Sequence, residues 1–258
     1  QRFVDFANSN PTSQGAAGDG DTGVTPYTNT YSLEFDGTDD FVEIGEISPR
    51  FNDSAETSES ATAAPWSLSL WAYISSFASG ANKVQLFNTP VGANVYSWKL
   101  VMSGGKVQFG ARYRTIRVRE TGTTAINFGE WNHIVVTFDG VDPLDLSSWK
   151  LYINSVDITA LTGGGHLGTN GFATMYIGRA ASNYNLGKID EVSLFDYKLT
   201  AANVTSIYNG GIPNDISSLS PLAWWNFNEG SGTTAIDSGT GGNNGTISGA
   251  IYSTNVPG

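Results

Sequence analysis

The sequence contains no cysteine and only two histidines, and charged residues make up 14% of its 258 positions. Without cysteine there are no disulfides, thiolate zinc sites or cysteine nucleophiles, and His133 and His166 are too few for a multi-histidine metal centre. The shortage of charge disfavours long solvated helices, whose outer faces need Glu and Lys. The longest mainly apolar stretch, Trp66 to Ile74, is far shorter than the roughly 20 residues that cross a bilayer, so we expect no membrane insertion.

The chain is acidic, with 24 Asp and Glu against 13 Lys and Arg. Nonspecific binding to nucleic acid or to an anionic membrane depends on basic side chains, so we expect neither partner. Aromatic residues reach 12% and glycines number 31. This composition favours an all-β protein whose strands are joined by glycine and asparagine turns.

The pattern along the chain predicts three segments: an arm and linker over 1–30, a β-sandwich over 31–210, and a strand segment over 211–258 that packs on the sandwich or on a neighbouring subunit. Alternating apolar residues on both sides of Asp36–Asp40 predict a hairpin. Thr200 as N-cap and Gly210 and Gly211 as a stop predict one short helix. Short strands ended by turn residues are predicted at 66–74, 83–88, 96–102, 107–113, 115–120, 131–139, 149–154, 174–177 and 188–195.

Five phrases resemble, in order and spacing, the laminin-G-like, concanavalin A-like jelly-roll domains. They are residues 35–42 (FDGTDDFV), 66–71 (WSLSLW), 131–140 (WNHIVVTFDG), 150–154 (KLYIN) and 189–195 (IDEVSLF). The resemblance implies a two-sheet antiparallel jelly-roll sandwich, and leaves function open because this fold hosts lectins, adhesion modules and enzymes. The tail phrase at 225–238 normally precedes the first of these. In this position it is similar to laminin-G-like proteins of marine bacteriophages, which implies an extracellular or virion-surface location.

The resemblance places the 36–40 turn near the strand that carries Asp190. Calcium prefers carboxylate and carbonyl oxygens, so Asp36, Asp39 and Asp190 form the expected calcium ligand set, with Asp40 and Glu191 in reserve. The alternative is that the aspartates of the turn only close it by hydrogen bonds to the backbone.

Four of the seven arginines in this acidic protein fall within eight residues: Arg112, Arg114, Arg117 and Arg119. Guanidinium groups bind oxyanions in a bidentate manner, so such a patch suits a sulfated, uronic or phosphorylated glycan. A solvated strand that pairs with neighbouring acidic residues is the alternative.

Catalysis is not expected. Glycoside hydrolases of this class place Glu-x-Asp-x-x-Glu on one strand, giving paired carboxylates. Here Glu34 and Asp36 begin that pattern, but the second glutamate is missing. We therefore expect no enzyme activity.

Two sets of aromatic residues are assigned different roles. Trp66, Trp71 and Trp131 lie in strand phrases and are expected in the core. Adjacent Trp224 and Trp225 must face opposite sides of a strand, so one of them is available to a partner. Together with Phe3 and Phe6 of the N-terminal arm, they predict a homo-oligomer built through the chain ends.

The sequence thus favours a non-enzymatic attachment and assembly module on an extracellular or virion surface, with a glycan as its target. One alternative is a purely structural subunit of a surface filament or capsid decoration without a glycan ligand. Another is an accessory domain of a secreted hydrolase.

Overall fold

The computed structural model describes residues 26–45, 47, 64–75, 83–88, 97–103, 106–113, 116–141, 145–159, 174–180 and 183–258. Sheet A contains β1 (Ser32–Asp36), β3 (Trp66–Ile74), β8 (Trp131–Phe138), β9 (Trp149–Ile153), β10 (Val156–Asp157), β14 (Leu186–Phe195), β15 (Ala223–Trp225) and β18 (Ile251–Ser253). Sheet B contains β2 (Phe41–Gly45), β4 (Lys83–Asn88), β5 (Ser97–Ser103), β6 (Lys106–Tyr113), β7 (Ile116–Ala125), β11 (Met175–Ile177), β16 (Thr234–Ala235) and β17 (Gly245–Ser248). The other elements are β12 (Arg179–Ala180), β13 (Asn183–Tyr184), α1 (Ala201–Tyr208), and the short 3-10 turns η2 (Leu146–Ser148), η3 (Asn209–Gly211) and η4 (Ser217–Leu219).

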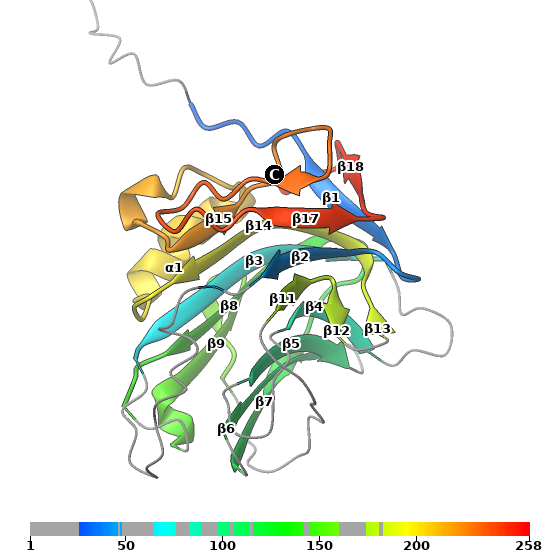
Figure 1. Cartoon of the computed structure of the whole chain (residues 1–258). Coiled ribbons are helices and arrows are strands. Elements are labelled where there is room, and N and C mark those ends of the chain that lie inside the picture. The colour runs from blue at the N-terminus through cyan, green and yellow to red at the C-terminus, as the bar shows by residue number, and fades with distance from the viewer. Residues whose placement is uncertain are drawn as a thin grey trace, which may run out of the picture.

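The two sheets lie face to face (Figure 1). The strand order in sheet A is β10-β9-β8-β3-β14-β1-β18, with β15 also paired to β14. The order in sheet B is β16-β17-β2-β11-β4-β5-β6-β7. These pairings are antiparallel, which confirms the expected jelly-roll sandwich with one short helix.

The main core fills the space between the sheets. Leu68, Leu70 and Ile74 of β3 alternate toward it and are almost completely buried. Trp149 packs against Phe138 at 4.3 Å and against Trp66 at 5.7 Å between ring centroids. Burying a large apolar side chain contributes about 1.5–3 kcal/mol, so this interface supplies much of the stability of the domain.

A second apolar layer covers the outer face of sheet A. Thr200 caps α1 by accepting a hydrogen bond from the Asn203 N–H at 3.1 Å, which confirms the predicted helix and its N-cap. Val204 and Ile207 of α1 are buried in the same cluster as Val135 of β8. No helix in the described ranges has the length and apolar character that a membrane crossing requires.

The hairpin predicted around Asp36–Asp40 is wrong. β1 pairs with β14 and β18 in sheet A, whereas β2 pairs with β11 and β17 in sheet B. The turn therefore carries the chain from one sheet to the other. Alternation on both sides of a tight turn is compatible with either arrangement, because it reports burial of one face and not the identity of the partner strand.

The C-terminal segment pairs with the sandwich of its own chain (Figure 1). It adds β15 to β14, β17 to β2 and β18 to β1, and thus contributes to both sheets. Trp225 is buried in the main core, and Trp224 is buried in the outer cluster at 4% exposure. The two indoles face opposite sides as expected, but the prediction that one of them is available to another subunit is wrong, because Trp224 is covered by the same chain.

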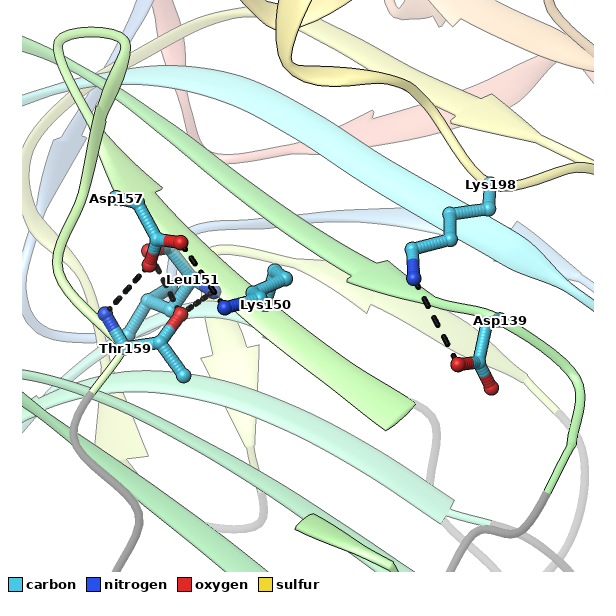
Figure 2. Close-up of polar contacts among 6 residues, drawn as sticks. All are labelled: Asp139, Lys150, Leu151, Asp157, Thr159 and Lys198. Atoms are coloured by element: carbon cyan, nitrogen blue, oxygen red, sulfur yellow. Dashed lines mark hydrogen bonds and ion pairs between the residues drawn. The ribbon is translucent and has the colours of Figure 1, made fainter. Parts of the chain in front are cut away.

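Polar contacts brace the β10 edge of sheet A, as Figure 2 shows. The Lys150 ammonium lies 3.1 Å from the Asp157 carboxylate, which also accepts a hydrogen bond from the Thr159 N–H at 2.9 Å. The Thr159 hydroxyl in turn accepts from the Leu151 N–H at 3.0 Å. Because both charged groups are partly exposed, we assign this ion pair a role in edge geometry more than in stability.

Candidate functional site

A cavity of about 500 Å³ opens on the outer face of sheet A, beside the C-terminal end of α1. We call it the aromatic pocket. It is lined by Trp71, Tyr73, Gly129, Glu130, Trp131, Tyr208, Gly210, Gly211, Ile212 and Gly258. Aromatic rings from two strands and a helix thus meet in one concave surface.

Strand alternation places the rings of β3 and β8 in this pocket. Leu70, Ala72 and Ile74 point into the core, so Trp71 and Tyr73 point outward. The register pairs Tyr73 with Trp131 across β3 and β8. Tyr208 is the last residue of α1, and Asn209 ends the helix in a left-handed conformation at φ 45°.

The rings are held by one another and by polar neighbours. Trp71 is 2% exposed and stacks on Tyr208, with centroids 5.7 Å apart and planes 20° apart. The Tyr73 and Trp131 rings lie 5.8 Å apart, and the Trp131 indole N–H donates to Asn255 Oδ1 at 3.0 Å. Tyr73, Trp131 and Tyr208 are only half-buried, so they are the rings that a ligand can reach.

A single charged side chain stands among the lining residues, the exposed Glu130. Its Oε2 accepts a hydrogen bond from Asn127 Nδ2 at 2.9 Å, which holds the carboxylate at the rim. Beneath the pocket, His133 is fully buried and its ring lies 4.9 Å from that of Trp71. Burial lowers the pKa of His133 to about 3, so it is neutral and contributes no charge to the pocket at physiological pH.

A separate polar cluster lies at the bulge of β14, where Asp190 and Glu191 are 0% and 6% exposed. We call these two residues the buried acid pair. The register between β14 and β3 shifts here, and Glu191 has a left-handed backbone at φ 51°. The bulge turns the Glu191 side chain toward the Tyr27 hydroxyl and the Trp224 indole, which both donate to it, the indole at 2.7 Å.

The electrostatics of the pair follow mainly from burial. Burial, and secondarily the charge of Glu191, raise the pKa of Asp190 well above its usual range. Burial raises the pKa of Glu191 to about 8, against the opposing hydrogen bonds from Tyr27 and Trp224. Asn29 Nδ2 donates to Asp190 Oδ2 at 2.8 Å. The pair therefore retains a proton near neutral pH and fastens the segment before β1 to β14.

The structure separates the three residues expected to bind calcium. Asp36 and Asp39 lie with Asp40, each offering a ligand atom within 4.8 Å of the others. The ladder pairs Asp36 with Leu186, which puts Asp190 roughly 13 Å away along β14 at about 3.3 Å per residue. Asp190 is therefore not in the cluster, and Asp40, the reserve, takes its place.

The 36–40 turn also has the side-chain to backbone hydrogen bonds that were expected if its aspartates only close the turn. Asp36 Oδ1 accepts from the Thr38 N–H at 2.7 Å, and Asp40 Oδ2 accepts from the Asp36 N–H at 2.8 Å. Burial raises the pKa of Asp40; the hydrogen bond from the Asp36 N–H opposes this rise, and the neighbouring carboxylates add to it. These bonds account for the turn without a metal, and calcium binding stays a prediction.

The predicted arginine patch falls on β6 and β7, whose arginine positions the structure describes only through the backbone. The β6–β7 register puts Arg112 opposite Arg117 and Gly110 opposite Arg119, so these three arginine positions share one face of the hairpin. Phe109 of β6 is in the core, so this is the face of sheet B that points away from the core. Arg114 lies outside the described residues, as do Phe3 and Phe6 of the expected assembly arm.

The aromatic pocket itself was not predicted. Trp131 was assigned to the core but forms a wall of the pocket, and Trp71 is buried on the outer face of sheet A and not between the sheets. The available signal was the parity of β3, because Trp71 and Tyr73 alternate with Leu70, Ala72 and Ile74. The sequence gives no comparable signal for Tyr208 and Glu130, since their positions at the pocket depend on how α1 and the 126–130 loop pack against sheet A.

Comparison with known proteins shows the family of the chain. A family model described as the concanavalin A-like lectin/glucanases superfamily matches residues 36–205. No curated protein sequence matches the chain. A Bacteroides ovatus protein described as carbohydrate-binding has a similar structure, with a TM-score of 0.57 and 15% identity over 90% of this chain. The match spans 62% of that protein, which is less than two thirds of its length.

Two further structures give lower scores. A heptameric SAP-like pentraxin from Limulus polyphemus has a TM-score of 0.47 at 14% identity, over 70% of this chain and 82% of the pentraxin. The receptor-binding domain of botulinum neurotoxin D has a TM-score of 0.46 at 17% identity, over 72% of this chain and 45% of that domain. The family match covers most of the chain, and the chain therefore belongs to the concanavalin A-like lectin/glucanases superfamily.

Proposed function

We propose that this protein is a non-enzymatic carbohydrate-binding module and that its aromatic pocket receives a sugar ring. The observation that carries this proposal is the set of half-buried rings of Tyr73, Trp131 and Tyr208 around one cavity. Aromatic faces pack on the apolar C–H surface of a sugar ring, while polar groups at the rim bind its hydroxyls. The volume of the cavity falls in the range of small-molecule sites, about 300–1,000 Å³.

The carboxylates of the chain support binding more than hydrolysis. Glycoside hydrolases use two carboxylates on either side of the scissile bond. Among the described residues that line the pocket, Glu130 is the single one with an acidic side chain. The buried acid pair is not part of the pocket lining, and Glu34 forms an ion pair with Lys188 at 3.4 Å.

Display on an extracellular or virion surface is part of this proposal. It is supported by the resemblance of the tail phrase to bacteriophage laminin-G-like proteins. The predicted homo-oligomer loses one of its supports, because Trp224 and Trp225 are buried within their own chain.

The test is a glycan array probed with the full chain, followed by calorimetric titration of the glycans that bind. Trp131→Ala removes one wall of the pocket and is expected to weaken binding at least about tenfold, since a stacked aromatic contributes of the order of 1 kcal/mol beyond its buried area. Phe128→Ala is the matched control: Phe128 is an exposed aromatic three residues before Trp131, in the loop that leads into β8, and it does not line the pocket.

Tyr208→Ala tests the opposite wall in case loss of Trp131 perturbs folding. Equal affinity of both pocket variants and the wild type would move the binding site elsewhere. Absence of binding to any arrayed glycan would overturn the proposed function.

A further inference from the structure

The aromatic pocket has one acidic side chain in its lining and no basic side chain among the described lining residues. Glu130 is exposed at the rim, and its Oε1 accepts no hydrogen bond from the described part of the chain. None of the described residues that line the pocket is Lys or Arg. The whole chain carries a net charge of −11, so its long-range field also attracts cations and repels anions.

The rings themselves suit a positive charge. The π face of Trp or Tyr attracts an ammonium group that lies within about 6 Å of the ring centroid. The structure has one such contact at the pocket wall, where the Lys188 Nζ is 5.1 Å from the centroid of Tyr73. Lys188 is itself paired with Glu34 at 3.4 Å, so its charge is already compensated. Trp131 and Tyr208 line the same pocket as Glu130, and no lysine stands among the described lining residues.

We infer that the aromatic pocket recognises a sugar that carries a free, protonated amine, with the sugar ring on the aromatic residues and the ammonium at the Glu130 carboxylate. This inference rests on the proposed function and names its ligand class. A neutral sugar of the same shape keeps the ring contact and loses the charge contact. An acidic sugar places its carboxylate against Glu130 and is rejected.

The experiment compares three oligosaccharides of equal length, one of glucosamine, one of N-acetylglucosamine and one of a uronic acid. Binding to the full chain is measured by calorimetry at low salt, in a buffer acidic enough to keep the amine protonated. An exposed ion pair contributes little, so we expect glucosamine to bind about two- to fivefold more tightly than its acetylated counterpart. Added salt should reduce this ratio, because it screens exposed charges.

Glu130→Gln is expected to abolish the glucosamine preference while it leaves binding of N-acetylglucosamine unchanged. Glu43→Gln is the matched control, because Glu43 is an exposed glutamate of β2 and does not line the pocket. It makes the same change in net charge, so a preference retained in Glu43→Gln and lost in Glu130→Gln assigns the effect to the pocket.

Equal affinity of the wild type for the two hexosamine oligomers, with both dependent on Trp131, would overturn this inference and leave the proposed function standing. Tighter binding of the uronic acid oligomer would also overturn it and would favour the arginine positions of β6 and β7 as the site. Absence of binding by all three oligomers and by every arrayed glycan would overturn the proposed function as well.

Discussion

Glu191 shows how a single backbone irregularity determines the environment of a side chain. Its left-handed φ of 51° at the β14 bulge lies outside the region preferred by residues with a Cβ. The bulge directs its carboxylate to Tyr27 and Trp224, where it is 6% exposed. Two donors stabilise the ionised form, yet burial prevails and raises its pKa to about 8. Proton uptake is therefore linked to folding at this residue.

The direction of that linkage can be tested. The folded-state pKa of Glu191 is raised above the ordinary 4.5, so its contribution to the free energy of unfolding is fully present below about pH 4.5 and is lost as the pH rises through about 8. Glu191→Gln mimics the protonated acid and cannot titrate. We expect urea unfolding between pH 5 and pH 8 to show a smaller loss of stability in this variant than in the wild type.

Some slope should remain in Glu191→Gln, because the pKa of Asp190 is raised by the same burial. The control is Glu43→Gln, which removes an exposed carboxyl and should keep the wild-type slope. Equal slopes in all three proteins would show that Glu191 does not govern the pH dependence.

The Asp36–Asp40 turn illustrates at the scale of an element what sequence reasoning can and cannot predict. Strands such as Trp66–Ile74 and Lys83–Asn88 have the predicted bounds, because alternation and turn residues are local signals. The predicted pairing of the two strands on either side of the turn was wrong, because pairing depends on residues far away in the chain. The same limit applies to the pocket, whose walls come from positions near 71, 131 and 208.

Calcium binding at this turn stays a prediction. Asp36 and Asp40 accept backbone hydrogen bonds, whereas Asp39 is exposed and has the most freedom to bind a cation. If the folded state alone binds calcium, the melting temperature should rise with calcium concentration and fall in excess chelator. Asp39→Asn preserves both hydrogen bonds and should remove this response. A wild-type melting curve unaffected by calcium and by chelator would leave the aspartates with their turn-closing role alone.

The whole molecule is a sandwich completed by its own tail. β15 and β18 extend sheet A, and β16 and β17 extend sheet B, so the C-terminal segment is an integral part of the domain. The resemblance predicted the fold because its phrases mark core strands. It did not predict whether the tail packs in its own chain or in a neighbour, since the same strand satisfies the same edge in both cases.

Assembly through the N-terminal arm stays a prediction at this scale. Phe3 and Phe6 give the arm two large apolar groups in a β-prone phrase, and such a phrase can add a strand to an exposed edge of another copy. We expect light scattering to show an oligomer for the full chain and a monomer for a chain that begins at residue 26. Monomers with equal melting temperatures in both samples would show that the arm does not join copies.

The pairing of β1 with β18 also determines how the domain responds to force. The two strands are antiparallel and Ser32 pairs with Ser253, so the chain entering β1 and the chain leaving β18 depart from the same end of the ladder. Tension on both segments would open this ladder one hydrogen bond at a time, as a zipper opens, without shearing all the bonds together. Tyr27 and Asn29, which are fastened to the buried acid pair, would take the load before β1 does. Those carboxyl groups are the mechanical anchor of the N-terminal side. The hydrogen bonds from Tyr27 and Asn29 favour the ionised acids, so deprotonation would lower the stability of the fold without weakening this tether.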